Sequence, residues 1–412
     1  MTPIYIAGIA MTVFGRHIER SLESLAREAL EGALADAGCS RADPGIAFYC
    51  GMTNGYLQGQ IAIPGQVVFS KIGIEGIPIF NIENACASGS SAFNLAVQSL
   101  RAGTTDVALV LGAEKMNIAD KQRAFSIFEA GWDVSRADEN FATLARMGEG
   151  VEVPPGSESD RPYSRFMAIY AAMCRYHMKT YGTTQRQIAA VSAKNHGHSV
   201  HNPYSQFRKA FTIEEILAAP PITYPITLPM CAPLSDGAAA AILCTDEGRA
   251  RIGADRSRCI RIAASVIRSF THRGLDQPEL HIGRLAAQQA YAEAGLGPKD
   301  MHIAELHDAS AMGEIIQAEN LGLVAPGMGG PAAERGEFTL GGRIPINTSG
   351  GLESKGHPLG ATGLGQLYEL VTQLRGEAGA RQVTGARHAI QENGGGLQGV
   401  EEAALAIHIL RR

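Results

Sequence analysis

The stretch REALEGALADAGCSRADPGIA, residues 27–47, recurs in altered form as RLAAQQAYAEAGLGPKDMHIA, residues 284–304. The two windows align without gaps at a constant offset of 257 residues, and nine of the 21 aligned positions are identical. Each window predicts an amphipathic helix that ends at a glycine, Gly38 or Gly295, and is followed by a strand. The shared order of helix, Ala-Gly stop and Ile-Ala strand indicates an internal duplication.

A further strand–turn–helix–strand unit follows each window. In the first half the predicted parts are a strand at 77–82, a turn containing Cys86, a helix near 89–102 and a strand at 107–111. In the second half they are a strand at 344–346, a glycine-rich loop at 347–363, a helix near 364–374 and a strand near 388–391. Alternating strands and helices predict parallel or mixed sheets covered by helices. The sequence therefore indicates a duplicated α/β fold.

The region between the two units has a different composition. It is richer in aromatic residues, Met, His and Arg, has Pro-rich ends, and contains the helix-like run YSRFMAIYAAMCRYHMKTYG. The segment SDGAAAAIL then supplies a strand that is expected to return to the first half. The predicted organisation is a first half of residues 1–117 and 236–250, an inserted, mostly helical region of residues 118–235, and a second half of residues 251–412.

Composition excludes several classes of protein. The formal net charge is −5 and no run of Lys or Arg is present, which argues against nucleic acid as a partner. The seven cysteines are scattered without a Cys-x-x-Cys pair, so neither a disulfide framework nor a metal site is expected. The N-terminus predicts a first strand and no signal peptide, and no stretch of 18 apolar residues predicts a membrane span. We therefore expect a cytoplasmic protein.

Two segments place reactive side chains at the ends of predicted elements. Cys86 lies at the start of a predicted helix, where unpaired N–H groups and the helix dipole are expected to favour the thiolate. In AELHDAS, His307 and Asp308 directly follow a predicted strand, which is where open α/β sheets place ligands. Each feature alone also fits an ordinary structural role, as a buried thiol or as a capping Asp beside a structural His.

Two glycine-rich segments complete the set. His357 lies in NTSGGLESKGHPLGATG ahead of a helix, where it is a candidate base for a thiol. In QENGGGLQG, three glycines after the strand could turn backbone N–H groups inward as an oxyanion hole. Alone, these segments are also compatible with a simple turn and a flexible loop. Together the four segments supply the nucleophile, base and oxyanion donors that acyl-thioester chemistry needs.

The motifs that carry this chemistry resemble those of the thiolase superfamily, most closely the sterol-carrier-protein-2-type thiolases. They are ENACASGSSA at 83–92, AEKMN at 113–117, SDGAAAAIL at 235–243, AELHDAS at 304–310 and NTSGGLESKGHPLGATG at 347–363. The resemblance spans essentially the whole chain. It implies the duplicated thiolase fold, with two βαβαβαββ halves in α-β-α-β-α layers and an insert, residues 118–235, that covers CoA.

The resemblance also implies roles for individual residues. Cys86 would attack a thioester or 3-keto carbonyl, His357 would take the thiol proton, and His307 would hold an oxyanion-hole water. The N–H groups of Cys86 and of Gly394 or Gly395 would form a second oxyanion hole. CoA would be a co-substrate with no permanently bound cofactor, and the protein would be a homodimer or a higher oligomer.

The sequence departs from this pattern in its second catalytic cysteine. Typical thiolases carry it in a Cys-x-Gly loop near the C-terminus, where this chain has Glu392, and many sterol-carrier-type enzymes carry a cysteine where this chain has Ala309. Glu392 could serve as the acid/base, because a carboxyl in a partly apolar site can have a raised pKa. Alternatively, a branched or aryl substituent stabilises the enolate, or the protein catalyses only acyl transfer or another part of the reaction.

We therefore expect a thiolase that cleaves or forms a 3-ketoacyl-CoA through an acyl-cysteine, in lipid metabolism or a degradation resembling β-oxidation. Its acyl-CoA is expected to be unusual: branched, aryl or sterol-like. Two alternatives remain open. One is a thiolase-like lyase or C-acyltransferase, and the other is a subunit active only with a small zinc- and OB-fold-containing partner of the DUF35 type.

Overall fold

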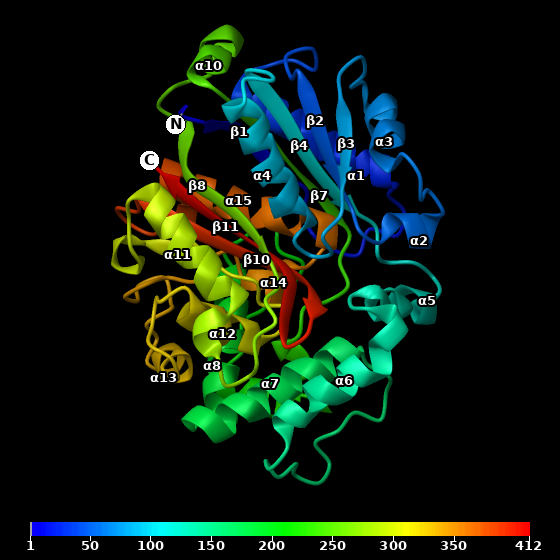
Figure 1. The fold of residues 1–412 in the computed structure, drawn as a ribbon, viewed down its shortest axis with the longest axis vertical. Helices are drawn as coiled ribbons and strands as arrows, with labels where there is room; N and C mark the ends of the chain where they lie inside the picture. Colours follow the sequence, from blue (N-terminus) through cyan, green and yellow to red (C-terminus); the bar gives the residue numbers. More distant parts are fainter. Residues whose placement is uncertain (1) are drawn as a thin grey trace.

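Residues 2–412 are described by a computed structural model, in which nine strands form one mixed sheet with helices on its faces (Figure 1). The first half contributes, in spatial order, β3 (Ile79–Ile82), β2 (Ile46–Cys50), β4 (Val107–Glu114), β7 (Gly237–Cys244) and β1 (Tyr5–Met11). The second half continues with β8 (Ile260–Ser269), β11 (Glu401–Arg411), β10 (His388–Gln398) and β9 (Ile303–Glu305). The halves join where β1 pairs with β8 through only Tyr5 and Ile6.

The two halves share one pairing plan. In the first half β2 is parallel to both β3 and β4, and β7 runs antiparallel to β4 and β1. In the second half β9 is parallel to β10, and β11 runs antiparallel to β10 and β8. The predicted strand at 344–346 is wrong as a strand. Ile346 makes a single parallel bridge to Ala304, at the position that β3 occupies beside β2.

The duplicated windows fold as the sequence predicts. α1 (Leu22–Ala37) and α11 (Ile282–Ala294) end at Gly38 and Gly295, whose φ angles of 70° and 66° are left-handed. Glycine adopts this conformation without steric cost, which explains the shared Ala-Gly stop. α1 packs on β1 and β7, and α11 packs on β8 and β11.

The central layer consists of two buried helices, α4 (Ser88–Arg101) and α15 (Leu359–Arg375). α4 contacts β2 and β4 of the first half and β8 and β11 of the second, while α15 contacts β4 and β7 as well as β9 and β10. Both helices are buried nearly all round, as expected for helices that lie between the two halves of the sheet, each of which forms one layer. This arrangement confirms the expected α-β-α-β-α layering of the duplicated thiolase fold.

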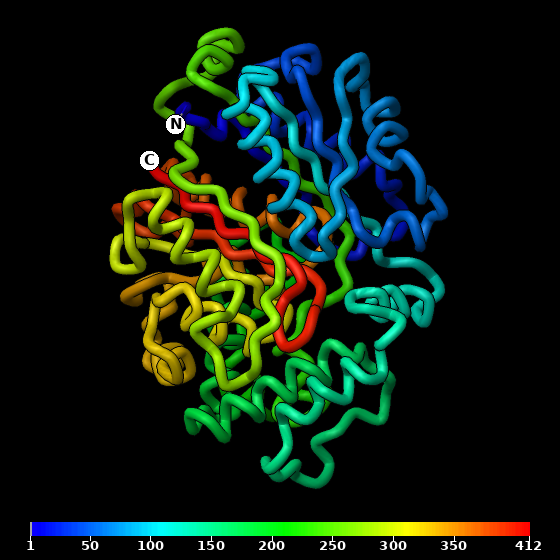
Figure 2. Tube along the Cα trace, in the orientation of Figure 1, coloured from blue at the N-terminus to red at the C-terminus, as the bar shows by residue number. Residues whose placement is uncertain are grey.

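The segment between β4 and β7 is mostly helical and forms one end of the molecule, as the cyan and green trace in Figure 2 shows. Its helices are α5 (Lys121–Ser126), α6 (Ala137–Ala145), α7 (Arg165–Tyr181), α8 (Gln185–Ser199) and α9 (Ile213–Leu217), followed by the short pair β5 (Pro221–Thr223) and β6 (Ile226–Thr227). α8 packs on α12 (Ala311–Asn320), α13 (Gly329–Glu334) and α14 (Gly351–Lys355). The remaining helices are α2 (Asn54–Gln58), α3 (Pro64–Ile72) and α10 (Asp246–Ile252). Within residues 2–412, no helix is long and apolar enough to cross a membrane.

Two sequence motifs meet around one buried carboxylate. Asp236, from SDGAAAAIL, accepts hydrogen bonds of 2.7 Å from the N–H groups of Met116 and Asn117 in AEKMN. It also forms a 2.8 Å ion pair with Lys115. Because Asp236 is completely buried, these donors satisfy a carboxylate that would otherwise be costly to bury. The contact anchors both ends of the helical segment to the first half.

Candidate active site

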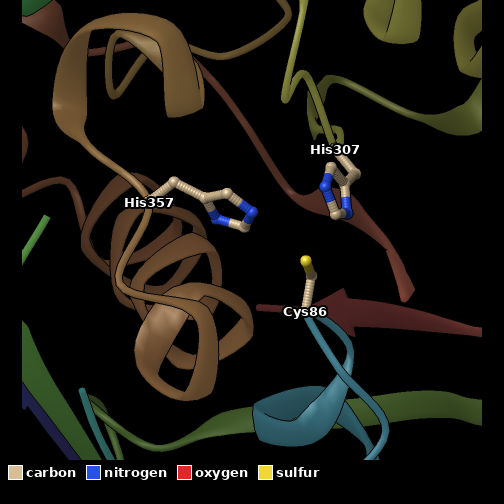
Figure 3. Close-up of side chains that lie close together, drawn as sticks. All are labelled: Cys86, His307 and His357. Carbon is tan, nitrogen blue, oxygen red and sulfur yellow. The ribbon is translucent and has the colours of Figure 1, made fainter. Parts of the chain in front are cut away.

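Cys86, His307 and His357 converge at one point between the two halves (Figure 3). The sulfur of Cys86 and a ring nitrogen of each histidine all lie within 4.8 Å of one another. Cys86 precedes α4, His307 follows β9, and His357 precedes α15. The structure thus brings together three of the four side chains predicted to be catalytic.

A strained turn presents Cys86. The preceding residue, Ala85, has a φ of 49°, a left-handed conformation that residues other than glycine rarely adopt. The N–H groups of Ala87 and Ser88 are taken by the carbonyls of Asn84 and Ala85, which closes the turn. A Cβ at Gly395 would lie 2.1 Å from the Asn84 carbonyl oxygen, so β10 passes this turn at a distance that only glycine permits.

The resting thiol of Cys86 is neutral. Burial raises its pKa to about 12, and the charge of Glu114 acts in the same direction, while the N–H of Cys86 itself lowers the pKa. The expectation that the helix N-terminus favours the thiolate is therefore wrong for the resting site, because removal from water outweighs the helix end. For this sulfur to act as a nucleophile, a base would have to take its proton.

His357 is held with a free lone pair toward the sulfur. Its Nδ1 lies 2.7 Å from Oγ1 of Thr362, and the single proton of that hydroxyl points to the Pro358 carbonyl at 3.1 Å. Nδ1 therefore carries the ring proton and Nε2 the lone pair. Within residues 2–412 this buried Nε2 has no hydrogen-bond partner. Burial, and then the charges of His307 and Lys355, hold the pKa of His357 well below its usual value, so the ring is neutral.

His307 faces the same point from the other side. Its ring centroid lies 5.2 Å from that of His357 at an interplanar angle of 72°, and its Nδ1 lies 3.3 Å from Nδ2 of Asn393. Burial lowers the pKa of His307 to about 4, opposed by the Gly394 carbonyl. The three side chains thus meet in their uncharged forms at neutral pH.

The fourth predicted catalytic residue, Glu392, lies behind His307. One carboxyl oxygen accepts a 2.9 Å hydrogen bond from the His307 backbone N–H, and the other is buried without a partner in the described chain. Burial, and then the nearby Glu402, raise the pKa of Glu392 well above its usual value, opposed by the His307 N–H. Glu392 is completely buried and does not line the pocket beside Cys86. Its role as an acid/base stays a prediction.

The expected glycine-rich loop at 394–396 is wrong, because these residues belong to β10. Gly394 pairs with Leu405 and Gly395 with Ala404 in the antiparallel ladder of β10 and β11, and the chain reverses only near Gly399. The reason is that the partner strand β11 continues the ladder past the glycines. Gly394 and Gly395 still line the pocket beside Cys86, so their oxyanion role stays a prediction.

A pocket of about 860 Å³ opens from Cys86, His307 and His357. One face of α7 lines it, with side chains spaced three or four residues apart, namely Met167, Tyr170, Met173 and His177. The helix is predicted from the sequence, but its contribution to a pocket is not. The periodic placement of its methionines and aromatic residues is the signal that could have revealed the pocket. Cys231 also lines the pocket but is not one of the three groups within 4.8 Å of each other.

The same three side chains also satisfy a metal-ligand spacing. Among residues 2–412 they form the one group of histidine, cysteine and carboxylate side chains close enough to hold a metal ion. Zinc is commonly bound by cysteine and histidine. The cysteine pattern of the sequence predicts no metal site, and this stays a prediction.

Comparison with known proteins adds independent findings. The thiolase N-terminal domain matches residues 4–217, and the thiolase C-terminal domain-like family matches residues 272–408. Sterol carrier protein 2 of Rattus norvegicus is 36% identical over 95% of this chain and 69% of its own length. The benzoylsuccinyl-CoA thiolase subunit BbsB of Thauera aromatica is 33% identical over 92% of this chain and 91% of its own.

A solved structure entitled Ltp2-ChsH2(DUF35) aldolase shares the fold. Its TM-score is 0.75 at 24% identity, with 99% of this chain and 97% of that chain covered. The two family matches cover residues 4–217 and 272–408, and the layering, the repeat and the converging side chains all agree with them. The chain belongs to the thiolase family and is an acyltransferase of that family.

Proposed function

We propose that the protein cleaves or forms a 3-ketoacyl-CoA through an acyl group carried on Cys86. The observation that carries this proposal is the convergence of one neutral thiol and two neutral imidazoles within 4.8 Å at the wall of a large pocket. Because the thiol is protonated at rest and Nε2 of His357 is an unpaired base, proton transfer to His357 accompanies attack by sulfur.

In the cleavage direction, Sγ of Cys86 attacks C3 of the substrate and His357 takes the thiol proton. The C2–C3 bond then breaks, its electron pair leaves on C2 as an enolate, and the acyl group remains on sulfur. C2 takes a proton from an acid. Our candidate is Glu392, whose pKa is raised by burial; because its carboxyl lies outside the pocket lining, its proton would reach C2 only through an intervening group. The thiol of CoA then gives its proton to the group that protonated C2 and attacks the acyl-Cys86 thioester. The departing sulfur takes back the proton held by His357, so the shortened acyl-CoA leaves and the thiol is restored.

The acyl group is proposed to be bulky and largely apolar. The pocket volume of about 860 Å³ exceeds the needs of a two-carbon acyl group, and the face of α7 supplies Met167, Tyr170 and Met173 to its wall. The name of the Thauera relative, a benzoylsuccinyl-CoA thiolase subunit, is consistent with an aryl substituent. A branched, aryl or sterol-like acyl chain fits this space best.

A panel of 3-ketoacyl-CoA substrates tests the proposal. We expect kcat/KM for CoA-dependent cleavage to rise from acetoacetyl-CoA to branched and aryl substrates. Met173→Trp, which fills the pocket, should lower kcat/KM for the bulky substrates only. Met178→Trp on the same helix, outside the pocket lining, is the matched control. Equal rates for all chain sizes would contradict the assignment of the pocket.

The protein is further proposed to act as a homodimer through the edge of the sheet at β3. This strand pairs only with β2, and a row of exposed backbone groups at a sheet edge favours pairing with another chain. Large apolar side chains are exposed on and near it: Phe80 at 48%, Ile61 at 80% and Ile63 at 59%. Light scattering should give a dimer for the wild type and a monomer for Phe80→Arg.

A lyase that works with a DUF35-type partner is the second candidate. Two observations favour it. In the described chain no second cysteine joins the group of Cys86, His307 and His357, although Cys231 lines the same pocket, and the chain shares the fold of an aldolase whose title names a DUF35 component. The two candidates differ in their need for the thiol. Retro-aldol cleavage that survives Cys86→Ala, or turnover seen only after addition of a small OB-fold partner, would replace the first proposal with the second.

A further inference from the structure

A buried chain of hydrogen bonds runs from the interior of the second half to His307. Nε2 of Gln391 donates to Oγ of Ser90 at 2.7 Å, and Oγ of Ser90 donates to Oδ1 of Asn393 at 2.8 Å. Nδ2 of Asn393 in turn lies 3.3 Å from Nδ1 of His307. Gln391, Ser90 and Asn393 are completely buried, so each polar group in the chain depends on its neighbours.

Backbone carbonyls, which can only accept, fix the direction of this chain. Nε2 of Gln366 donates to the Glu392 carbonyl at 3.0 Å, so its Oε1 faces Gln391 at 2.8 Å and requires a donor there. The Gly363 carbonyl, 3.2 Å from the same nitrogen of Gln391, makes the same demand. Gln391 therefore presents its amide nitrogen to Ser90 as well, and its two N–H groups are shared among three acceptors.

The direction then passes from Ser90 to the histidine. Because the Ser90 hydroxyl accepts from Gln391, its one proton is free for Oδ1 of Asn393. That places the amide nitrogen of Asn393 toward Nδ1 of His307, which then accepts. The Gly394 carbonyl also bonds to the His307 ring and competes as an acceptor of the ring proton, so the two tautomers differ in which of these contacts is made. The opposite amide orientation would leave the Ser90 proton without an acceptor among these groups and would bring the Asn393 oxygen near the Gly394 carbonyl, which lies 3.5 Å from Nδ2.

We propose that Asn393 is a positioning residue that holds His307 in the tautomer with its proton on Nε2. His307 then presents a proton, and His357 a lone pair, to the same reacting centre. The two neutral imidazoles thereby take complementary roles: one accepts the thiol proton and the other donates to the oxygen on which negative charge develops. This assignment rests on the proposed function for its catalytic meaning, but the tautomer itself is a property of the resting protein.

The direct test is nitrogen NMR of the full-length protein labelled with [¹⁵N]histidine, with no substrate present. The His307 signals are assigned by their loss in His307→Gln. We expect an unprotonated Nδ1 and a protonated Nε2 in the wild type. Asn393→Leu, which removes the donor, should shift the proton toward Nδ1, whose alternative acceptor is the Gly394 carbonyl. A proton on Nδ1 in the wild type would overturn the proposal.

A second variant gives a readout that packing alone would not move. In Asn393→Asp a buried carboxylate faces Nδ1, which should raise the pKa of His307 and introduce a new ionisation into the pH profile of kcat. The titratable groups that face this ring are Cys86, His357 and Glu392, and none of them is altered in the variant. An unchanged pH profile in a folded Asn393→Asp protein would contradict the assignment.

Steady-state kinetics distinguish a positioning role of Asn393 from a nonspecific structural effect of its substitution. Asn393→Leu should lower kcat about 10- to 100-fold with KM changed by less than about threefold, because the lost donor acts on the transition state. In a His307→Ala background the same change should cost nothing further, since Asn393 acts through His307. Additive losses in the double variant would refute this coupling.

Asn94→Leu is the matched control. Asn94 is a buried amide on the same helix as Ser90 and donates to the carbonyl and hydroxyl of Ser265, away from the pocket. It should lower the melting temperature without changing the His307 tautomer. A failure of the proposed function would be recognised separately, as the absence of any acyl group on Cys86, and would leave the NMR result intact.

Discussion

The two halves place their reactive residues at the same position and then diverge around them. Cys86 stands two residues before the first residue of α4, and His357 stands two residues before the first residue of α15. Each half also braces the other: Glu114 at the end of β4 accepts from the Gly360 N–H at the start of α15, and Gly395 in β10 packs on the turn before α4. The duplication thus places the proposed nucleophile and the proposed base at one structural position.

The divergence lies in the strands behind these turns. At the offset of 257 residues His307 corresponds to Cys50, a buried thiol that bonds only to the Leu111 carbonyl. Cys50 is paired with Gly112 in the β2–β4 ladder, whereas the His307 ring contacts the side-chain amide of Asn393. The first half therefore fills these positions with small or apolar groups and the second half with a buried polar chain. Ser90 of the first half also joins this polar chain. A buried polar chain costs free energy unless it is satisfied, so its presence behind His307 points to function.

Removing the thiol of Cys86 should have the largest effect on activity. Cys86→Ala should lower the rate of CoA-dependent cleavage by at least about 10⁴-fold, because no group in the second half can replace the thiol. Cys50→Ala, which changes the buried thiol at the position corresponding to His307, is the control and should affect stability more than rate. Steady-state assays on both variants check this. A Cys86→Ala enzyme with near wild-type activity would refute the acyl-enzyme route.

Removing the base should have the next largest effect. His357→Gln is expected to lower kcat about 10²- to 10⁴-fold, because the Cys86 thiol, with a pKa of about 12, loses its proton acceptor. Alkylation of Cys86 by iodoacetamide should slow in the same variant, as read by peptide mass spectrometry. The other six cysteines serve as internal controls. Unchanged alkylation of Cys86 would show that His357 does not activate the sulfur.

Disrupting the contact between β10 and the turn that holds Cys86 should have the third largest effect. Gly395→Ala places a Cβ 2.1 Å from the Asn84 carbonyl and 2.7 Å from the Ala87 nitrogen. We expect a loss of about 1–3 kcal/mol in the free energy of unfolding together with reduced kcat, because the turn must shift. Denaturant titration and kinetics measure both. Gly385→Ala, a change with open space around it at a left-handed glycine, separates backbone strain from collision.

The hydroxyl that orients His357 should have a smaller effect. Thr362→Val keeps the side-chain shape but removes the acceptor for Nδ1–H, which releases the tautomer of His357. The loss of one buried hydrogen bond corresponds to about 1–3 kcal/mol, so kcat should fall about tenfold or more. If Thr362→Val retains full activity, the Thr362 hydroxyl is not needed to hold the base.

The smallest effect concerns stability against pH. Burial lowers the pKa of His408 to about 3, whereas an unfolded histidine titrates near 6.5. The unfolded chain therefore binds more protons below about pH 6.5, and the stability due to neutral His408 is lost as pH falls toward 3. His408→Gln should reduce the pH slope of the unfolding free energy there by up to about 1.4 kcal/mol per pH unit. An identical slope in wild type and variant would contradict a buried neutral His408.

Much of the fold was predictable because it rests on local signals. The helix period and the Ala-Gly stops gave α1 and α11, and the strand patterns gave both halves. The sequence could not reveal that residues 394–396 continue β10, since three glycines favour a loop and only the pairing with β11 overrides that preference. Nor could it reveal the state of Cys86, because the helix end favours a thiolate and the burial that opposes it depends on the whole fold.

The candidate site also had a part that was predictable from local sequence and a part that depends on the assembled fold. Cys86, His307 and His357 were identified from motifs, and the structure places them together. Ser90, Asn393 and Thr362 were missed, because a buried serine, asparagine or threonine carries no sequence signal that distinguishes it from a polar surface residue. Their contribution depends on hydrogen-bond direction, which only the assembled core defines.

Intact-protein mass spectrometry after exposure to a panel of 3-ketoacyl-CoA and acyl-CoA compounds tests the central claim most directly. The account predicts a mass gain equal to one acyl group, located on the peptide that contains Cys86, lost on addition of CoA and absent from Cys86→Ala. Turnover of the same compounds with no acyl group on Cys86, in a protein whose Cys86→Ala variant remains active, would contradict it.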